Sequence, residues 1–159
     1  MRVHLGLGSN LGDRDAHLAG ALRALRAADP DLAVSPLYET APVGGPPGQG
    51  PYLNCVVRFE TDLTPPELLA LTRSIEAAAG RTRGERWGAR TLDVDVLVVE
   101  GVEQDDPELV LPHPRMSERA FVLAPLEDLD PDLVPEGWRD ALGGPERISR
   151  MVRRVRGAP

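Results

Sequence analysis

The feature that most constrains this fold is a repeated change in the spacing of apolar residues along the chain. Residues 2–8 alternate apolar with polar or small residues, which is typical of a strand, and residues 13–28 repeat apolar positions every three or four residues, which is typical of a helix. The same two spacings then predict strands at 32–39, 52–61 and 91–99, and a second helix between Thr64 and Gly80. The order strand, helix, strand, strand, helix, strand predicts an α+β fold with a ferredoxin-like βαββαβ core and an antiparallel sheet. With its C-terminal extension, the chain is expected to form a three-layer α-β-α arrangement.

Both predicted helices begin with recognisable capping residues. Asp13 precedes a helix whose apolar stripe is Leu18, Ala21, Leu22 and Leu25. Thr64, with Pro65 after it and Glu67 three residues on, forms the pattern of a capping box. The expected buried stripe of that second helix is Leu68, Leu71, Ile75 and Ala78.

The C-terminal extension gives weaker signals. A short helical segment is expected at 117–127 and one further helix within 138–154. Residues 146–159 carry five arginines and one acid, and a solvated helix end is the favoured interpretation. With 159 residues and no visible linker, the whole of 1–159 is expected to form a single domain.

All 18 basic residues are arginine, and the chain contains no lysine. This excludes a P-loop, a Schiff-base enzyme and any lysine general base. The net charge of -7 argues against a general nucleic-acid partner, and the absence of an apolar run near 20 residues argues against a membrane partner. The single cysteine, Cys55, fits a reducing compartment, so a cytoplasmic location is expected. The protein is also expected to be a monomer.

Residues 41–51 read as a loop, because eight of these eleven residues are glycine or proline. Proline stiffens such a loop and glycine supplies pivots, so a lid over a site is one interpretation. An idle surface loop is the alternative.

The predicted strand 91–99 carries the clearest chemical signal. Asp93 and Asp95 are two residues apart, so both carboxylates leave one face of the strand, opposite Leu92, Val94, Val96 and Val98. Two carboxylates this close favour a hard cation such as Mg²⁺, which keeps its other positions for water and substrate phosphates. Two ions bridging phosphate oxygens would use both aspartates. Solvent-facing acids on an exposed sheet face are the alternative.

Four arginines, at positions 81, 83, 86 and 90, precede these aspartates. Guanidinium groups hold phosphate oxygens, so arginines beside carboxylates favour a phosphate ligand bound together with metal. A local salt-bridge network is the competing interpretation, although it gives no role to Trp87. Nothing in the chain has the spacing of a covalent catalytic triad or of a dinucleotide-binding glycine motif.

At this point the sequence resembles a known family. The segment from Arg86 to Leu97, RWGARTLDVDVL, looks like the signature of the 6-hydroxymethyl-7,8-dihydropterin pyrophosphokinases of folate biosynthesis. Further matching segments follow the family's order: LGSNLG at 7–12, SPLYET at 35–40, YLN at 52–54, PHPRM at 112–116 and RAF at 119–121. The resemblance covers about residues 3–135, although Ala89 and Pro114 depart from the usual residues.

The resemblance implies an ATP-dependent diphosphotransferase that passes the terminal diphosphate of ATP to the pterin hydroxymethyl group and releases AMP. Two Mg²⁺ ions are then expected on Asp93 and Asp95, with Arg81 and Arg90 as further catalytic residues. The implied ATP-binding residues are Glu76, Arg83, Arg86, His113 and Arg119, and the implied pterin-binding residues are Thr40, Val43, Tyr52, Asn54, Trp87 and Phe121. The loops 41–51 and 81–90 are expected to close over the substrates and exclude water.

Two rival interpretations come from other classes of protein. One is a non-catalytic ligand-binding module on the same fold, which would need neither paired carboxylates nor a lid. The other is a single-stranded nucleic-acid module, which the net charge and the few aromatic residues disfavour.

Overall fold

A computed structural model describes residues 1–80 and 91–159 of the chain. Its elements alternate as β1 Arg2–Ser9, α1 Arg14–Ala28, β2 Ala33–Val34, β3 Leu37–Thr40, β4 Tyr52–Glu60, α2 Pro65–Ala78 and β5 Asp93–Val99. A hairpin of β6 Gln104–Asp106 and β7 Leu109–Leu111 follows, then short 3₁₀ turns at Met116–Glu118 and Pro131–Leu133 flanking α3 Ala120–Leu129. The chain finishes with α4 Trp138–Ala141, α5 Pro145–Met151 and β8 Val152–Arg156.

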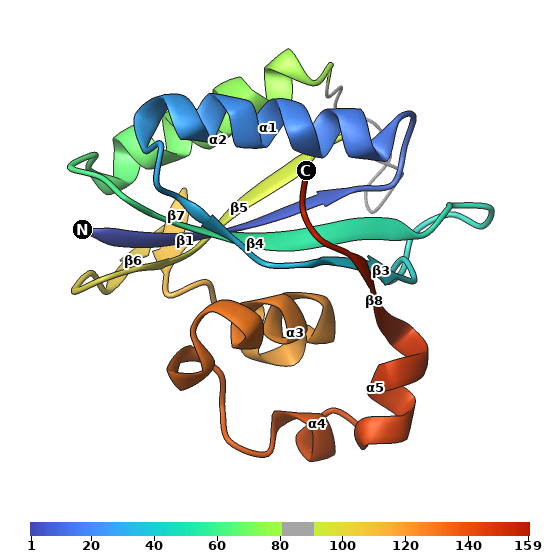
Figure 1. Cartoon of the computed structure of the whole chain (residues 1–159). Helices are drawn as coiled ribbons and strands as arrows, with labels where there is room; N and C mark the ends of the chain where they lie inside the picture. Colours follow the sequence, from blue (N-terminus) through green and yellow to red (C-terminus); the bar gives the residue numbers. More distant parts are fainter. Residues whose placement is uncertain (81–90) are drawn as a thin grey trace.

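The central sheet is antiparallel and has the strand order β5-β1-β4-β3-β8, with β2 also paired to β4. Figure 1 shows α1 and α2 on one face of this sheet and α3, α4 and α5 on the other. The expected α+β fold, with its βαββαβ core and three layers, is therefore confirmed. No helix in the described ranges is long and apolar enough to cross a membrane.

The core between the sheet and α1 and α2 forms from the predicted apolar positions. Leu18, Ala21, Leu22 and Leu25 of α1 are buried there, and so is the alternate-residue row of β4, which is Leu53, Cys55, Val57 and Phe59. In α2 the expected stripe is partly wrong, because Leu68 and Ile75 are buried but Ala78 is exposed, and Thr72 is buried instead. Burial raises the pKa of the Cys55 thiol to about 12, because the interior disfavours a thiolate.

The helix starts follow the capping signals. Asp13 accepts a hydrogen bond from the Ala16 amide at 3.0 Å. Glu67 accepts hydrogen bonds from both the backbone amide and the hydroxyl of Thr64, each at 2.7 Å. These caps satisfy amides that the first turn of a helix leaves without partners.

Two predictions about strands are wrong. The expected strand at 32–39 is broken into β2 and β3 at Ser35-Pro36, where Ser35 instead exchanges backbone and hydroxyl hydrogen bonds with Val56. In β5 the register against β1 shifts between His4 and Leu5. This irregularity puts both Leu97 and Val98 against the α3 side, so Val98 does not share the face of Val96.

The C-terminal predictions need larger corrections. The expected helix at 117–127 begins later and ends later, as α3, with a 3₁₀ turn before it. The tail is not a solvated helix end, because residues 152–156 form β8 and extend the sheet beside β3. The region 138–154 holds two short helices instead of one.

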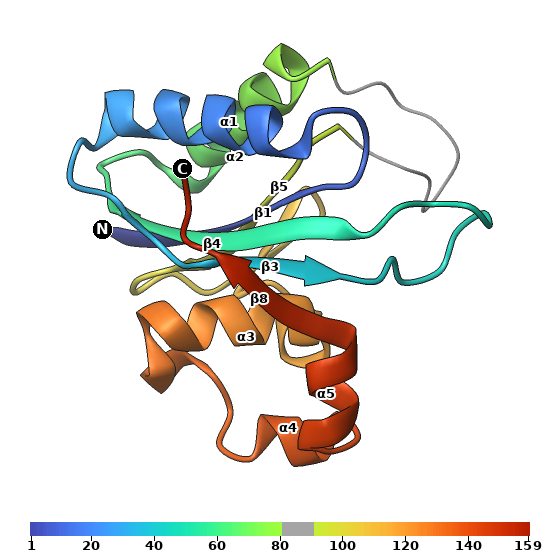
Figure 2. The ribbon, with the colours of Figure 1, turned by 45° about the vertical axis from the view of Figure 1, so that its right-hand side comes forward.

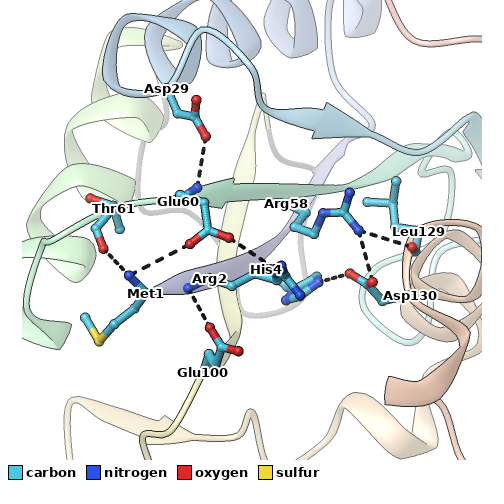
Figure 3. Close-up of polar contacts among 10 residues, drawn as sticks. All are labelled: Met1, Arg2, His4, Asp29, Arg58, Glu60, Thr61, Glu100, Leu129 and Asp130. Atoms are coloured by element: carbon cyan, nitrogen blue, oxygen red, sulfur yellow. Dashed lines mark hydrogen bonds and ion pairs between the residues drawn. The ribbon is translucent and has the colours of Figure 1, made fainter.

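A polar cluster ties the end of α3 to the central strands (Figure 3). His4 Nε2 of β1 lies 2.5 Å from Asp130 Oδ2, and Arg58 of β4 donates to Asp130 Oδ1 at 3.0 Å. Partial burial opposes ionisation of Asp130, but the hydrogen bonds from His4 and Arg58 outweigh it and hold the pKa of the carboxyl below its usual value. The cluster closes one end of the layer between the sheet and α3.

Candidate active site

A cavity of about 580 Å³ lies at the other end of that layer. Its floor is the sheet, and its walls come from the start of α3, the beginning of the 41–51 loop and the C-terminal α5 and β8. Most of the described residues predicted for the site line it, namely Thr40, Val43, Tyr52, Asn54, Asp93, Asp95, His113, Arg119 and Phe121. The fold therefore brings together predicted site residues that lie up to 81 positions apart in the sequence, the separation of Thr40 from Phe121.

The two aspartates of β5 face this cavity. They alternate with Val94 and Val96, which are buried in the core on the α1 and α2 side, so the period of two is confirmed for this pair. The Asp95 side chain is 43% exposed, and its Oδ2 lies 3.9 Å from Arg119 Nη1. Two partly exposed carboxylates on one cavity wall are ligands that suit a hard divalent cation.

Glu76 of α2 is predicted to bind ATP, but in the structure it accepts a hydrogen bond from the backbone of β5. Its Oε1 accepts a hydrogen bond at 2.9 Å from the backbone amide of Val94, the residue between the two aspartates. Glu76 is not among the residues that line the cavity. Glu76 therefore contributes to the site through its hydrogen bond to the backbone of β5.

The floor of the cavity is shaped by two glycines of β1. Gly6 and Gly8 both line the cavity, and Gly8 pairs with Asn54, whose Nδ2 donates to Thr40 Oγ1 at 2.7 Å in a buried position. A Cβ at Gly8 would collide with Asn54 Oδ1, whereas a Cβ at Gly6 would meet Leu97 at an ordinary 3.5 Å. Only glycine at position 8 leaves the amide of Asn54 in this orientation.

His113 and Arg119 occupy the wall below the aspartates. Arg115 donates its backbone amide to His113 Nδ1 at 3.2 Å, and His113 donates its own amide to Leu97 O at 2.8 Å. Burial lowers the pKa of His113, and the positive charges of Arg119 and Arg115 lower it further. The imidazole is therefore neutral at pH 7. The Arg119 guanidinium lies 5.6 Å from the centre of the Phe121 ring, which links the cationic and aromatic parts of the site.

The beginning and end of the loop 41–51 are attached to different parts of the molecule. Asn10 donates to Gln49 Oε1 at 3.1 Å and to Gly50 O at 3.2 Å, and Ala41 donates its amide to Met151 O at 3.4 Å. Val43 is 58% exposed on the cavity rim. The position of this loop agrees with a covering role over the cavity.

Five predicted site residues, Arg81, Arg83, Arg86, Trp87 and Arg90, lie outside the described residues. The sequence reasoning missed several that line the cavity, namely Gly6, Gly8, Arg115, Arg147, Met151 and Val152. The spacing of Gly6 and Gly8, two apart on a predicted strand, was a usable signal for a hollow. No sequence signal marked Arg147, Met151 and Val152 as cavity residues, because they reach the cavity through the pairing of β8 with the sheet.

Comparisons with known proteins show the family and the fold of this chain. A family model described as 7,8-dihydro-6-hydroxymethylpterin-pyrophosphokinase (HPPK) matches residues 4–131. A curated 2-amino-4-hydroxy-6-hydroxymethyldihydropteridine pyrophosphokinase of Methylorubrum extorquens is 51% identical, over 94% of this chain and 98% of the relative. The protein of the same description from Bacillus subtilis is 47% identical, over 80% of this chain and 77% of the relative. The fold also resembles a Plasmodium falciparum HPPK-DHPS crystal structure, with a TM-score of 0.58 and 16% identity, over 94% of this chain and 44% of that longer one.

Proposed function

This chain belongs to the 7,8-dihydro-6-hydroxymethylpterin-pyrophosphokinase family, and from that premise we propose how its own residues carry out the reaction. The enzyme transfers diphosphate from ATP to the hydroxymethyl group of 6-hydroxymethyl-7,8-dihydropterin and releases AMP, a step of folate biosynthesis. The observation that carries the residue assignment is one cavity that joins Asp93 and Asp95 to the buried Asn54–Thr40 pair. The first pair suits phosphate and metal, and the second suits a flat heterocycle.

Asp93 and Asp95 are the proposed ligands for two Mg²⁺ ions bound together with ATP. Their carboxylates share a strand face, and oxygen donors of this kind fit a hard cation that retains waters and phosphate oxygens. When bound, such ions offset the charge that develops on the transferring phosphate groups. Glu76 supports this side of the site indirectly, since its hydrogen bond to Val94 fixes the backbone between the two ligands.

Among the described residues, Arg119 and His113 are proposed to contact the ATP phosphates. Arg119 is close enough to Asp95 to hold a phosphate oxygen beside the metal ligands. A neutral His113 donates a hydrogen bond through Nε2 because its Nδ1 already accepts one. Arg81, Arg83, Arg86 and Arg90 are proposed for the same phosphates on the strength of the sequence alone.

The pterin is proposed to lie over Gly8. Asn54 is proposed to hydrogen-bond to the amide edge of the pterin. The bond from Asn54 Nδ2 to Thr40 fixes the amide so that Oδ1 accepts from the ligand. Tyr52, Phe121 and Val43 add apolar surface around the ring, and Trp87 is proposed to stack against it.

The hydroxymethyl oxygen attacks the β-phosphorus in line with the departing oxygen of AMP. The P–O bond to AMP breaks as the new P–O bond forms, and the hydroxyl proton passes to solvent. A loose transition state needs little covalent help, so the residues act by holding the two substrates in line and by stabilising charge. Closure of the 41–51 loop keeps water from competing with the pterin hydroxyl.

The decisive assay incubates the protein with ATP, Mg²⁺ and 6-hydroxymethyl-7,8-dihydropterin and measures AMP. We expect AMP to form only when the pterin is present and Mg²⁺ has not been chelated. Pterin binding without AMP would instead support a non-catalytic binding module. Replacement of Mg²⁺ by Ca²⁺ should leave ATP bound but lower the rate of transfer, because Ca²⁺ takes a looser geometry.

We further propose that residues 1–159 act as one domain and as a monomer in the cytoplasm, without a nucleic-acid or membrane partner. One sheet runs through both halves of the chain, and the free buried thiol of Cys55 fits a reducing compartment. Light scattering at micromolar concentration tests the monomer directly.

A further inference from the structure

The basic C-terminal tail forms one wall of the cavity. Arg147, Ile148, Met151 and Val152 line it, and they come from α5 and β8, which follow one another without a gap. Figures 1 and 2 show β8 beside β3 at the edge of the sheet, and α5 on the side of the sheet that holds α3 and α4. The matching family model ends at residue 131, so this wall lies outside the part of the chain that the family model covers.

β8 supports the strand that carries Thr40. β3 lies between β4 and β8, with Thr40 opposite Tyr52 on one side and opposite Val152 on the other. At the next residue, Ala41 donates its amide to Met151 O at 3.4 Å. The orientation of Asn54 depends on Thr40, and so it depends on the strand pairing that holds Thr40 in place.

A three-residue clamp joins β8 to β3 and α3. The Tyr38 hydroxyl donates to Asp128 Oδ2 at 2.5 Å, and Arg154 Nη2 donates to Asp128 Oδ1 at 2.5 Å and to the Tyr38 hydroxyl oxygen at 3.3 Å. Tyr38 is 8% exposed and stands opposite Asn54 in the strand register. The clamp therefore lies one strand away from the amide that is proposed to read the pterin.

The other two arginines of β8 also pair with acids elsewhere in the chain. Arg153 donates to Glu39 Oε1 at 3.2 Å, and Glu39 Oε2 also accepts from Arg14. Arg156 pairs with Asp15 at the start of α1. Together the three arginines contact β3, α3 and α1, so the tail is held to the fold by its charge as well as by its backbone.

We propose that α5 and β8 are the fixed wall of the pterin side of the cavity, and that Arg154 is a positioning residue for pterin binding. The inference rests on the proposed function of the cavity. Arg154 acts through Tyr38 and β3 on Thr40 and Asn54 and does not touch the reacting atoms. The two β5 aspartates lie on the opposite edge of the sheet, so the nucleotide side is expected to be insensitive to this clamp.

The test compares Arg154→Glu with Arg150→Glu in the full chain. Both variants change the net charge equally, but only the first places a carboxylate against Asp128. Arg150 is exposed on α5 and has no ion pair with any described residue. The measurements are the dissociation constant of the pterin, by its fluorescence in the presence of a non-hydrolysable ATP analogue with Mg²⁺, and the separate dissociation constant of that analogue.

We expect Arg154→Glu to raise the pterin dissociation constant about tenfold while the nucleotide constant changes less than about twofold, because a like charge replaces an attractive network contact. Arg154→Lys should restore most of the affinity, and Arg150→Glu should behave as the unmodified protein. Tyr38→Phe keeps the Arg154–Asp128 pair and removes only the hydroxyl, so it should weaken pterin binding by a smaller factor. This variant also provides a test if the charge reversal prevents folding.

The proposal is overturned if Arg154→Glu folds and binds pterin normally, or if the pterin and nucleotide constants rise by the same factor. An equal loss in Arg150→Glu would also overturn it, because that result would indicate a general charge effect. The proposed function fails separately, by the absence of pterin-dependent AMP from the unmodified protein. A normal AMP assay together with unchanged pterin binding in Arg154→Glu would refute only the positioning role.

Discussion

The two ends of the layer between the sheet and α3 use the same residue types in opposite ways. Along one face of β1, His4 fills its space and pairs with Asp130 (Figure 3), whereas Gly6 and Gly8 leave space that belongs to the cavity. The acid at the first end lies 2.5 Å from its histidine and 3.0 Å from its arginine. At the cavity end, Asp95 lies 3.9 Å from Arg119 and is 43% exposed.

This difference separates structural from functional polar groups. A closely paired, partly buried cluster is expensive to break because each remaining member then loses a partner that offsets the cost of its burial. A loosely paired and partly exposed group keeps the freedom to exchange its partner for a ligand. Histidine, aspartate and arginine therefore stabilise the fold at one end of β1, and at the other end they are the groups that we propose bind the substrates.

The largest expected effect is on the chemistry of the cavity end. Asp95→Asn should lower AMP formation at least about a thousandfold, because the carboxylate that we propose as a metal ligand becomes a neutral amide. The melting temperature should change by less than about 2 °C, since Asp95 is half exposed. Asp105→Asn, on an exposed position of β6, is the matched control and should keep full activity. Near-normal turnover in Asp95→Asn would remove the metal assignment.

The next effect is on the shape of the cavity floor. Gly8→Ala should raise the pterin dissociation constant about tenfold or more, because the new methyl group displaces the side chain of Asn54. Gly6→Ala is the control on the same strand face, where the methyl group makes an ordinary contact with Leu97. Equal affinities in a fluorescence titration of the two variants would contradict the proposed position of the pterin over Gly8.

At the end that His4, Arg58 and Asp130 close, a substitution should lower stability and leave activity unchanged. Asp130→Ala should lower the free energy of unfolding by about 2 kcal/mol, since His4 and Arg58 both lose their partner. For a chain of this size we expect the melting temperature to fall by about 5 °C, while the turnover number at 25 °C changes less than about twofold. Asp132→Ala, at an exposed neighbouring position, should leave both unchanged. A large loss of turnover with unchanged stability would reverse the assignment of the two ends.

The smallest effect is a difference in pH dependence between the two ends. The pKa of His113 is lower in the folded protein than its usual 6.5, so the unfolded chain binds more protons as the pH falls below that value. The contribution of the His113 end to the free energy of unfolding is therefore lost as the pH falls below about 6.5. The Asp130 carboxyl has a lowered pKa, so its contribution is kept above its usual 3.8 and is lost only as the pH falls through its still lower folded value.

Denaturant unfolding of the unmodified protein and of His113→Gln between pH 7 and pH 5 tests this difference. The free energy of unfolding of the unmodified protein should fall relative to that of the variant over this range. A difference that stays constant with pH would show that the imidazole has an ordinary pKa in the folded state.

The parts that the sequence predicted are those set by local spacing. The alternation in β4 and β5 places Asn54, Asp93 and Asp95 on one sheet face, and the capping residues locate both long helices. The approach of Arg119 to Asp95 spans 24 positions and arises from the turns before α3, which no local pattern determines. It was available only through the resemblance of the matching segments.

The misses have a common physical cause. The Val152–Arg156 segment lacks a clear alternation, and it is a strand because β3 offers an edge and acids on three other elements offer partners. The break at Ser35-Pro36 likewise depends on hydrogen bonds to Val56. In both places tertiary pairing decides a conformation that intrinsic preference leaves open.

Because Cys55 is buried, the rate at which an alkylating reagent modifies it measures how often the protein opens. Only the thiolate reacts with alkylating reagents, and its pKa of about 12 makes reaction in the closed protein very slow. Modification therefore reports how often β4 opens beside Asn54. A ligand that binds only the closed form should slow labelling by one plus the ratio of its concentration to its dissociation constant, which is about a hundredfold at one hundred times the dissociation constant. Labelling rates followed by mass spectrometry would thus give the affinities of nucleotide and pterin, and their mutual dependence, without any turnover.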